Sequence, residues 1–344
     1  MASAPLTPPR RILMIRLSAL GDLVFATTLL NGLRRQFPKA QIDWLTQTGY
    51  AELLGTQTAL DQVLDWDRHA WLRSLRQGRW ITLWRDMRAF RRVLQARDYD
   101  WVIDGQGLFK ARLLAWMAGG RWRVGPRSKE PGQWLMHTLL AAPGDNDARI
   151  AASHRVGLRE LTGTDGEAPR LDRPAGVITP PMAANTLVLA PFTTRPQKHW
   201  PEAHWVHLIT RLSARGFELM MLGGPADRDA AQRIIGALPA SVRLDNRVGD
   251  TSLVEATRLI ADCRAVIGVD TGLTHMGIAF DRPTVAIFGS TLPYRNGARA
   301  PLAVEWLGLD CSPCKRSPTC GGAFTCLQAL GPTRIEAALL QILR

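Results

Sequence analysis

Short apolar runs alternate with amphipathic stretches along this chain. The runs predict strands, and they span residues 11–17, 41–46, 62–66, 101–104, 186–190, 218–222, 265–269 and 284–288. Between them, apolar residues recur at the spacing of a buried helix face, as Leu23, Leu30 and Leu33 do. Strands that alternate with helices favour an α/β fold, in which helices cover both faces of a parallel sheet.

The alternation stops and starts again near the middle of the chain. Turn-forming residues fill 126–181, and within them the stretch 168–174 is typical of a linker. A chain of 344 residues is comfortable as two domains. We therefore predict two doubly wound domains, 1–170 and 171–344, facing each other across a cleft. An amphipathic helix is expected at 332–344.

Composition is that of a packed globular protein, with 46% hydrophobic residues. The sequence holds no run of eighteen apolar residues, and residues 1–9 lack the basic head and apolar segment of a signal peptide. We expect a cytoplasmic protein with a short disordered lead.

The net charge of +13 requires a partner or a surface that tolerates so much positive charge. Nucleic acid, anionic lipid and a phosphorylated substrate all qualify. No nucleic-acid-binding motif accompanies the charge, so nucleic acid is not an expected partner. No Gly-x-Gly-x-x-Gly follows the first strand, which argues against a dinucleotide-dependent enzyme.

Asp270 lies where an apolar strand ends and a helix begins. Gly272 allows the sharp turn between them, and the helix N-terminus offers free N–H groups to a diphosphate. A carboxylate beside such a corner can accept hydrogen bonds from sugar hydroxyls. The corner predicts a nucleotide-sugar site; the alternative is that Asp270 caps a core helix and His275 packs beneath it.

Two further loops follow predicted strands. Thr193, Thr194 and Lys198 come after the first strand of the second half and combine neutral donors with a point charge, as a diphosphate grip would. A solvated turn is the alternative for that loop. Asp22 follows the first strand of the chain, where it is either a helix cap or, if it faces a ligand, a general base.

These motifs resemble those of family 9 glycosyltransferases, the ADP-heptose:lipopolysaccharide heptosyltransferases. The resemblance rests on segments 16–22, 104–110, 129–131, 193–202, 269–275 and 281–283, which together span nearly the whole chain. The Thr-Thr-Arg and Lys-His-Trp-Pro-Glu forms are most similar to heptosyltransferase I, which adds the first heptose to the Kdo region of lipid A.

The resemblance implies a GT-B architecture of two Rossmann-like domains, with the acceptor in the N-terminal domain and ADP-heptose in the C-terminal one. It implies an inverting transfer that needs no catalytic metal or organic cofactor. Asp22 would be the base, and Lys198 with Thr193 and Thr194 would stabilise the departing ADP. Asp270 would hold heptose hydroxyls, while Thr271, Gly272 and His275 line the diphosphate.

The segment 249–253 resembles the adenine-side loop of the family, except that Thr251 stands where an apolar contact is expected. The family's acidic ribose contact falls after Pro225, where Asp227 and Asp229 are both candidates. Three functional alternatives stay open: transfer to a later core heptose, transfer to a protein acceptor, and a lipid-A-binding protein without activity.

The stretch 68–92 is strongly basic. It carries Arg68, Arg73, Arg76, Arg79, Arg85, Arg88, Arg91 and Arg92, with Trp71, Trp80 and Trp84 interleaved. In the family this region grips the acidic acceptor, so Arg68, Arg73 and Arg76 are acceptor-binding candidates, as are Lys110, Arg112 and Lys129 elsewhere. The tryptophans suit an anionic inner-membrane surface, and we expect peripheral association with its cytoplasmic face. The alternative is an ordinary solvated helix face.

Four cysteines crowd between 311 and 326. Cys311 and Cys314 form a Cys-x-x-Cys pair, with Cys320 and Cys326 nearby. Such a set suits a structural zinc or iron ion, and some relatives in the wider family carry a similar cysteine-rich finger. The alternative is four reduced, unligated thiols. The fifth, Cys263, is expected to fill space in the core.

Overall fold

The chain forms two compact units in the computed structural model, which describes residues 7–144, 147–179, 181–314 and 316–344. Unit 1 comprises the chain up to Asp147 together with Ala151–Glu167, and unit 2 comprises Ala148–Ile150 and Ala168–Arg344. Unit 1 therefore ends directly before the predicted linker 168–174. That stretch is bound to unit 2, because Arg299 donates to the carbonyls of Ala168 and Pro169.

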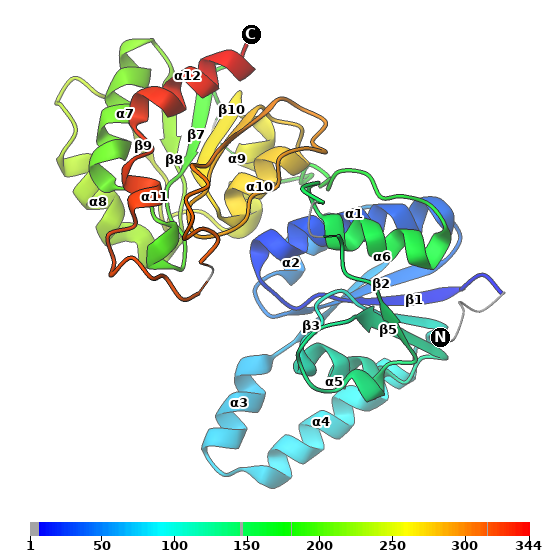
Figure 1. Cartoon of the computed structure of the whole chain (residues 1–344). Coiled ribbons are helices and arrows are strands. Elements are labelled where there is room, and N and C mark those ends of the chain that lie inside the picture. The colour runs from blue at the N-terminus through cyan, green and yellow to red at the C-terminus, as the bar shows by residue number, and fades with distance from the viewer. Residues whose placement is uncertain (1–6, 145–146, 180, 315) are drawn as a thin grey trace. The chain divides into compact units, whose positions relative to one another are not determined.

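Unit 1 is built on a six-stranded parallel sheet in the order β3-β2-β1-β4-β5-β6 (Figure 1). The strands are β1 (Arg11–Ile15), β2 (Gln41–Gln47), β3 (Gln62–Trp66), β4 (Trp101–Asp104), β5 (Trp122–Pro126) and β6 (Thr138–Leu140). The helices are α1 (Leu20–Gln36), α2 (Ala51–Leu54), α3 (Arg68–Arg76), α4 (Trp80–Gln95), α5 (Phe109–Ala118), the 3₁₀ turn η1 (Gln133–Leu135) and α6 (Ala152–Thr162).

Apolar side chains cover both faces of this sheet. One face packs Ile12, Trp44 and Trp101 against α1 and α6, and the other packs Leu13 and Val102 against α5. Burial on both faces explains why the central strands are nearly continuous apolar runs.

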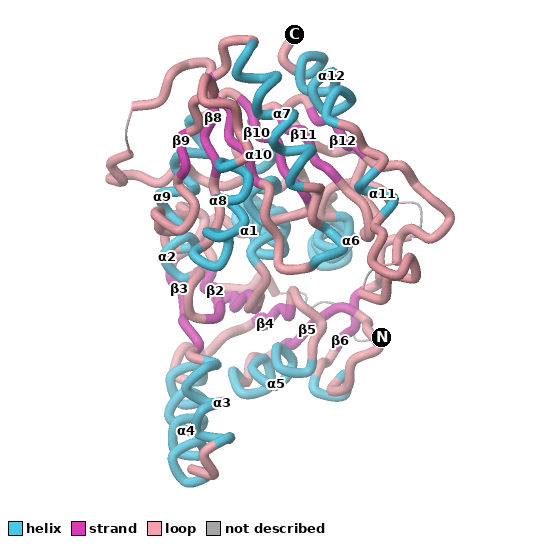
Figure 2. The backbone as a smooth tube through the Cα atoms, turned by 90° about the vertical axis from the view of Figure 1, so that its left-hand side faces the viewer, coloured by secondary structure: helices cyan, strands magenta, loops and turns pink. Residues whose placement is uncertain are grey.

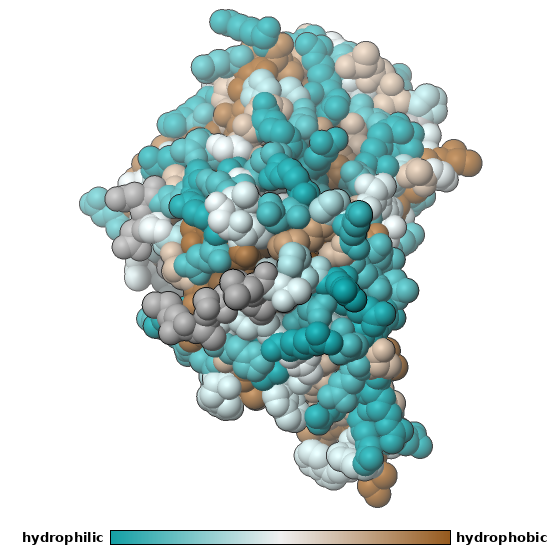
Figure 3. All heavy atoms as spheres, turned by 90° about the vertical axis from the view of Figure 1, so that its right-hand side faces the viewer, coloured by the Kyte–Doolittle hydropathy of each residue, from teal (hydrophilic) through white to brown (hydrophobic). Residues whose placement is uncertain are grey.

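The α3–α4 hairpin projects from the sheet of unit 1 (Figure 2). It is attached through a small aromatic cluster in which Trp71 meets Trp66 and Phe90 edge to face, at 5.4 and 5.9 Å between ring centroids. The face of the projection that Figure 3 shows is largely hydrophilic, with hydrophobic atoms at its outer end. Within the described part of the chain, no helix has the length and apolar character that crossing a bilayer requires.

Unit 2 has a second six-stranded parallel sheet, in the order β12-β11-β10-β7-β8-β9. Its strands are β7 (Thr186–Ala190), β8 (Glu218–Met221), β9 (Asp245–Asn246), β10 (Ala265–Val269), β11 (Thr284–Ile287) and β12 (Leu302–Glu305). Its helices and 3₁₀ turns are η2 (Pro196–Lys198), α7 (Glu202–Ala214), η3 (Pro225–Asp227), α8 (Arg228–Gly236), α9 (Leu253–Asp262), α10 (Gly272–Ala279), α11 (Thr325–Gln328) and α12 (Pro332–Ile342).

The C-terminal helix α12 packs on unit 2, where Glu336 accepts hydrogen bonds from Arg211 and Arg215 of the α7 region at 2.5 Å each. Cys263 is 1% exposed, and burial raises the pKa of its thiol to about 12, which confirms it as a core residue.

The predicted α/β class and the two doubly wound sheets are confirmed. All eight predicted strands form, although the first ends at Ile15 rather than at residue 17. The prediction missed β5, β6, β9 and β12. Each unit has the strand order of a Rossmann fold. The chain adds its second and third strands on one side of the first strand and its fourth to sixth strands on the other, so the strand order reverses between the first and fourth strands.

Candidate active site

The reversal point of the unit 2 sheet lies between β7 and β10, which pair in parallel. Ligands of such sheets bind outside the carboxyl ends of the strands at this point, because the loops after the two strands diverge there. The loop after β7 leads to Lys198, and the loop after β10 begins at Asp270. The topology therefore brings together two predicted donor-site loops, although Lys198 and Asp270 are 72 residues apart in sequence.

Asp270 is the centre of this corner. Its Oδ2 lies 2.5 Å from Lys198 Nζ and accepts a hydrogen bond from Thr291 Oγ1 at 2.6 Å. Its Oδ1 lies 3.2 Å from His275 Nε2. Burial by itself raises the pKa of Asp270, but hydrogen bonds and charge from His275 and Lys198 outweigh it and hold that pKa well below its usual range. The carboxylate is therefore ionised at neutral pH and fixed in position.

The backbone of the corner depends on close packing at Gly268. A Cβ there would lie 2.2 Å from Thr274 Oγ1 and 2.9 Å from the carbonyl oxygen of Ala190, so a larger residue does not fit. Thr274 uses its hydroxyl to donate to the carbonyl of Val269 at 2.7 Å. Thr271 is the extended N-cap residue of α10, and Gly272 is the first helical residue. Together they aim the start of α10 at the carboxyl edge of the sheet.

His275 is oriented by Tyr294. Its Nδ1 lies 2.9 Å from the Tyr294 hydroxyl, and the two rings meet edge to face at 5.6 Å. Burial, followed by the nearby charge of Asp270, raises the pKa of Tyr294 well above its usual value, so the hydroxyl keeps its proton. The Tyr294 hydroxyl at Nδ1 and the Asp270 carboxylate at Nε2 thus hold the His275 ring at both of its nitrogens.

The loop after β7 holds the other predicted donor residues. His199 Nε2 contacts the carbonyl of Thr193 at 2.7 Å and closes the loop. Thr194 is exposed, while Thr193 is half-buried. Trp200 is 2% exposed and donates to the carbonyl of Leu330 at 2.7 Å, which anchors the end of the loop in the core.

The loops after β8 and β9 lie side by side. Gly249 N–H donates to the carbonyl of Gly223 at 3.0 Å, and Thr251 follows in the loop before α9. Of the two acidic ribose candidates, Asp227 accepts a hydrogen bond from Gly224 N–H at 2.8 Å, whereas Asp229 is exposed.

In unit 1, Asp22 lies at the reversal point between β1 and β4, in the first turn of α1. Its side chain is 51% exposed, and its Oδ2 lies 2.5 Å from Arg16 Nη2. The same oxygen accepts a longer hydrogen bond from Ala19 N–H, at 3.3 Å. Asp22 thus has the capping contact of the simpler interpretation and a solvent-accessible carboxylate as well.

Other titratable groups lie near this carboxylate. His154 is partly buried, and burial, followed by the charge of Arg16, lowers its pKa to about 3, so its ring is neutral. Burial, followed by the charges of Arg68 and Arg16, lowers the pKa of Lys110. Arg68 therefore lies near Lys110, whereas Arg73 and Arg76 are exposed in the last turn of α3.

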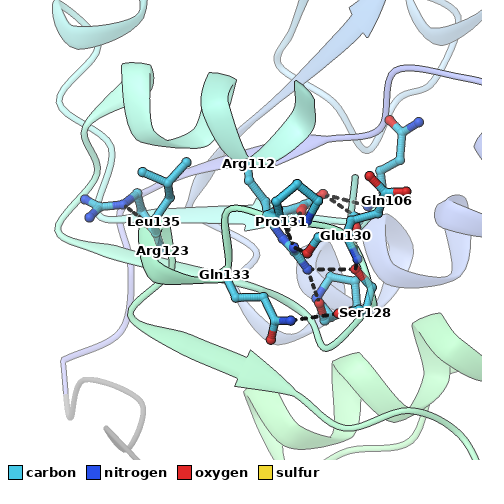
Figure 4. A network of polar contacts seen from close by, with 12 residues as sticks. Gln106, Arg112, Arg123, Ser128, Glu130, Pro131, Gln133 and Leu135 are labelled. Carbon is cyan, nitrogen blue, oxygen red and sulfur yellow. Dashed lines mark hydrogen bonds and ion pairs between the residues drawn. The ribbon is translucent and has the colours of Figure 1, made fainter. Parts of the chain in front are cut away.

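Arg112 is a scaffold residue and not a surface ligand (Figure 4). It is completely buried, and it donates to the carbonyls of Pro126, Glu130 and Pro131 and to Ser128 Oγ at 2.6–3.0 Å. These bonds hold the loop that carries Lys129, which is exposed.

Asp104 lies at the base of this network. Its Oδ2 is 3.9 Å from Arg112 Nε, and both atoms lack a hydrogen bond within the described residues. Its Oδ1 accepts hydrogen bonds from Gln106 and Gly107 N–H. Burial raises the pKa of Asp104 to about 6 despite these bonds.

More than half of the chain, residues 87–322, matches the sequence pattern of glycosyltransferase family 9 (heptosyltransferase). The chain belongs to glycosyltransferase family 9. It is similar to lipopolysaccharide heptosyltransferase 1 of Pseudomonas aeruginosa, with 32% identity over 90% of this chain and 87% of that protein. The enzyme of the same name from Escherichia coli K12 is 28% identical over 82% of this chain and 89% of its own length. This family 9 protein is therefore a glycosyltransferase.

Solved structures agree on the fold. Escherichia coli heptosyltransferase WaaC, in a structure with ADP-2-deoxy-2-fluoro heptose, superimposes with a TM-score of 0.74 at 24% identity, covering 96% of this chain and 99% of that chain. A family 9 glycosyl transferase from Veillonella parvula gives 0.75 at 19% identity, covering 97% of each chain. The predicted GT-B fold of the glycosyltransferase is confirmed.

The four clustered cysteines of the glycosyltransferase line one small cavity of about 40 Å³. Burial raises the pKa of Cys326, and the charges of Cys311, Cys314 and Cys320 add to the effect, which places all four near one another. Across the described ranges, which omit residue 315 of this loop, no group of three or more His, Cys, Asp or Glu side chains is arranged to hold a metal ion.

Sequence reasoning missed three partners of the predicted residues in this glycosyltransferase. Thr291 and Tyr294 lie in the loop after β11, the strand next to β10 in the sheet, and Arg16 directly follows β1. The signal for Thr291 and Tyr294 was the sheet order itself, since loops after neighbouring strands share an edge.

Proposed function

We propose that this glycosyltransferase transfers heptose from ADP-heptose to the Kdo or inner-core region of lipopolysaccharide, with inversion at the anomeric carbon. The observation that carries the proposal is the Asp270 corner. A fixed carboxylate, a lysine and a helix start converge there at the reversal point of a Rossmann-type sheet. The names of the curated relatives supply the sugar and the acceptor class.

In this proposal Asp270 accepts hydrogen bonds from heptose hydroxyls. Lys198 leaves its ion pair with Asp270 to meet the diphosphate, assisted by the hydroxyls of Thr193 and Thr194. Donors that are already in place for a developing charge stabilise it strongly inside a water-poor site. The start of α10 at Thr271 and Gly272, with His275 behind it, completes the diphosphate side, and Thr251 contributes on the nucleobase side.

Asp22 removes the proton from the acceptor hydroxyl as that oxygen attacks the anomeric carbon. The new glycosidic bond forms while the bond to ADP breaks, and the negative charge passes to the β-phosphate of ADP near Lys198. The half-exposed Asp22 carboxylate is accessible to such a hydroxyl. The basic residues Arg68 and Lys110, which lie near each other, bind the carboxylates and phosphates of the acceptor together with Arg73, Arg76 and Lys129.

The decisive experiment is incubation with ADP-heptose and Kdo-lipid A, followed by mass analysis of the product. Addition of one heptose supports the proposal. Transfer only to an already heptosylated core, or only to a protein, would move the assignment to those alternatives. Asp22→Asn should abolish turnover while ADP-heptose affinity is kept; unchanged turnover would exclude Asp22 as the base.

We propose, further, that the enzyme works as a cytoplasmic protein bound peripherally to the anionic inner face of the membrane, where a lipid-anchored acceptor is presented. The charge of +13 supports this location.

A structural zinc or iron ion at Cys311, Cys314, Cys320 and Cys326 is also proposed. It is supported by their convergence on one cavity and by the preference of these metals for thiolates. Metal analysis of anaerobically purified wild type and Cys314→Ser tests it. We expect stoichiometric metal in the wild type and none in the variant. Wild type without stoichiometric metal would rule the site out.

A further inference from the structure

An open groove of about 450 Å³ runs between α4 and α5 of unit 1. Met87 of α4 and Leu113 and Met117 of α5 contribute apolar lining, and Trp84 and Trp116 stand at its sides. These two tryptophan residues are 61% and 40% exposed, respectively. Large apolar surfaces of this kind on a soluble domain mark a site of interaction.

The groove has a basic border. Arg88 lies over the Trp84 ring at 5.1 Å, and Arg91 lies over the Trp116 ring at 4.8 Å. Arg92 also lines the groove. In the part of the chain that the structure describes, none of the three arginines forms an ion pair with a carboxylate. The rings hold two guanidinium groups at the border, where their N–H groups stay free for an anion.

The groove is separate from the proposed acceptor residues around Asp22. Those residues gather at the carboxyl edge of the sheet, where α5 begins with Phe109 and Lys110. The groove is lined by residues of α4 from Trp84 to Gln95 and by residues of α5 from Leu113 to Met117. Its lining therefore does not include the start of α5 at Phe109 and Lys110.

The rest of the hairpin has the same character. Residues 68–95 contain eight arginines and one acidic residue, Asp86. Leu75, Trp80 and Ile81, at the turn between α3 and α4, are 43%, 63% and 84% exposed. Exposed aromatic and aliphatic residues beside many arginines are typical of a helix that lies in a membrane interface.

We propose that this groove binds an anionic phospholipid of a bilayer surface. Arg88, Arg91 and Arg92 bind the lipid phosphate, and an acyl segment lies between Trp84 and Trp116. The groove then fixes which side of unit 1 meets the membrane. The inference deepens the proposed peripheral location and is independent of which sugar is transferred.

The test is cosedimentation of the full-length protein with phosphatidylcholine vesicles, with and without phosphatidylglycerol. Arg88→Gln, Arg91→Gln and Arg92→Gln are combined in one variant. Its matched control carries Arg10→Gln, Lys39→Gln and Arg243→Gln, which remove the same charge at exposed positions elsewhere. The groove variant should bind phosphatidylglycerol vesicles about 100-fold more weakly, and the control within about threefold of wild type. Equal loss in both variants would mean that only the net charge matters and would overturn the proposal.

A second variant, Trp84→Ala with Trp116→Ala, tests the apolar part. Its loss of vesicle binding should persist at high salt, where electrostatic attraction is screened. Undiminished vesicle binding by this variant would contradict the lipid site. A dimeric wild type that becomes monomeric on these two substitutions would contradict it as well.

Heptose transfer to a water-soluble, deacylated Kdo acceptor should be unchanged in every variant; reduced transfer would make the groove part of the acceptor site. If the wild type fails to transfer heptose but the vesicle results are as expected, the proposed function is refuted and the lipid-binding groove still stands.

Discussion

The ion pair between Lys198 and Asp270 gives a test with a magnitude. The atoms are 2.5 Å apart, and the side chains are 15% and 13% exposed. Breaking a fully buried pair costs about 3–5 kcal/mol, because one charge is left without its partner. In Lys198→Met, Thr291 and His275 still contact Asp270, and some solvent reaches it. The free energy of unfolding should therefore fall by about 2 kcal/mol.

Urea unfolding of Lys198→Met, Asp270→Asn and the double variant measures the coupling between the two residues. Each single variant should be destabilised and the double variant should recover part of the loss, giving a coupling of about 2 kcal/mol. A coupling below about 0.5 kcal/mol would refute the pair as a buried interaction.

The same Lys198→Met variant tests the role of the lysine in transfer. Removing one preorganised donor from a developing negative charge should lower kcat by about 10²–10³-fold. Initial rates at saturating ADP-heptose measure it, with acceptor binding as the control. Loss of acceptor binding alone would contradict a leaving-group role.

Three further changes test the supports of the two sites. Tyr294→Phe removes the hydroxyl next to His275 Nδ1. The variant should lose about 1 kcal/mol of stability, and its KM for the donor should rise with a smaller effect on kcat. An unchanged KM would mean that Tyr294 does not position the donor site. Gly268→Ala forces a Cβ into Thr274 Oγ1; thermal unfolding should show a loss of about 3 kcal/mol, and a stable variant would contradict the close packing. Asp104 has a pKa of about 6 in the folded protein, whereas in the unfolded chain an aspartate loses its proton near pH 4; between these values only the folded protein keeps the proton. Its contribution to stability is therefore complete below about pH 4 and is lost as pH rises through about 6, by about 3 kcal/mol. Asp104→Asn should remove that pH dependence, as denaturant titrations at pH 4 and 7 would show.

Sequence reasoning found the central strands because they are buried on both faces. Runs such as 186–190 and 265–269 are buried at every position and consist almost entirely of apolar residues, so the pattern marks them without tertiary information. The missed strands have other causes. The outermost strands β6 and β12 are short and only partly buried, and β9 has two residues. Such strands form by pairing with a neighbour and leave little pattern in the sequence.

Site residues show a similar division. Asp22, Lys198 and Asp270 were identified because each follows a strand and has chemistry of its own. Tyr294 and Thr291 were not identified, since their importance depends on which loops become neighbours. Arg112 resembled a surface ligand by residue type, but its guanidinium group is buried by backbone carbonyls that come from a loop 14–19 residues further along the chain.

Each Rossmann-type sheet has a carboxylate at its reversal point, Asp22 after the first strand of unit 1 and Asp270 after the fourth strand of unit 2, but the surroundings of the two differ. Asp270 is largely buried and contacts Lys198, Thr291 and His275. An acceptor hydroxyl would have to displace these partners before its proton could pass to the carboxylate. Asp22 is half-exposed, and one of its carboxylate oxygens lies apart from the contacts made with Arg16 and Ala19. A base must be reached by the hydroxyl it deprotonates, whereas a binding residue benefits from being fixed beforehand. The same topology thus gives Asp270 the properties of a binding residue and leaves Asp22 as the better candidate for the base.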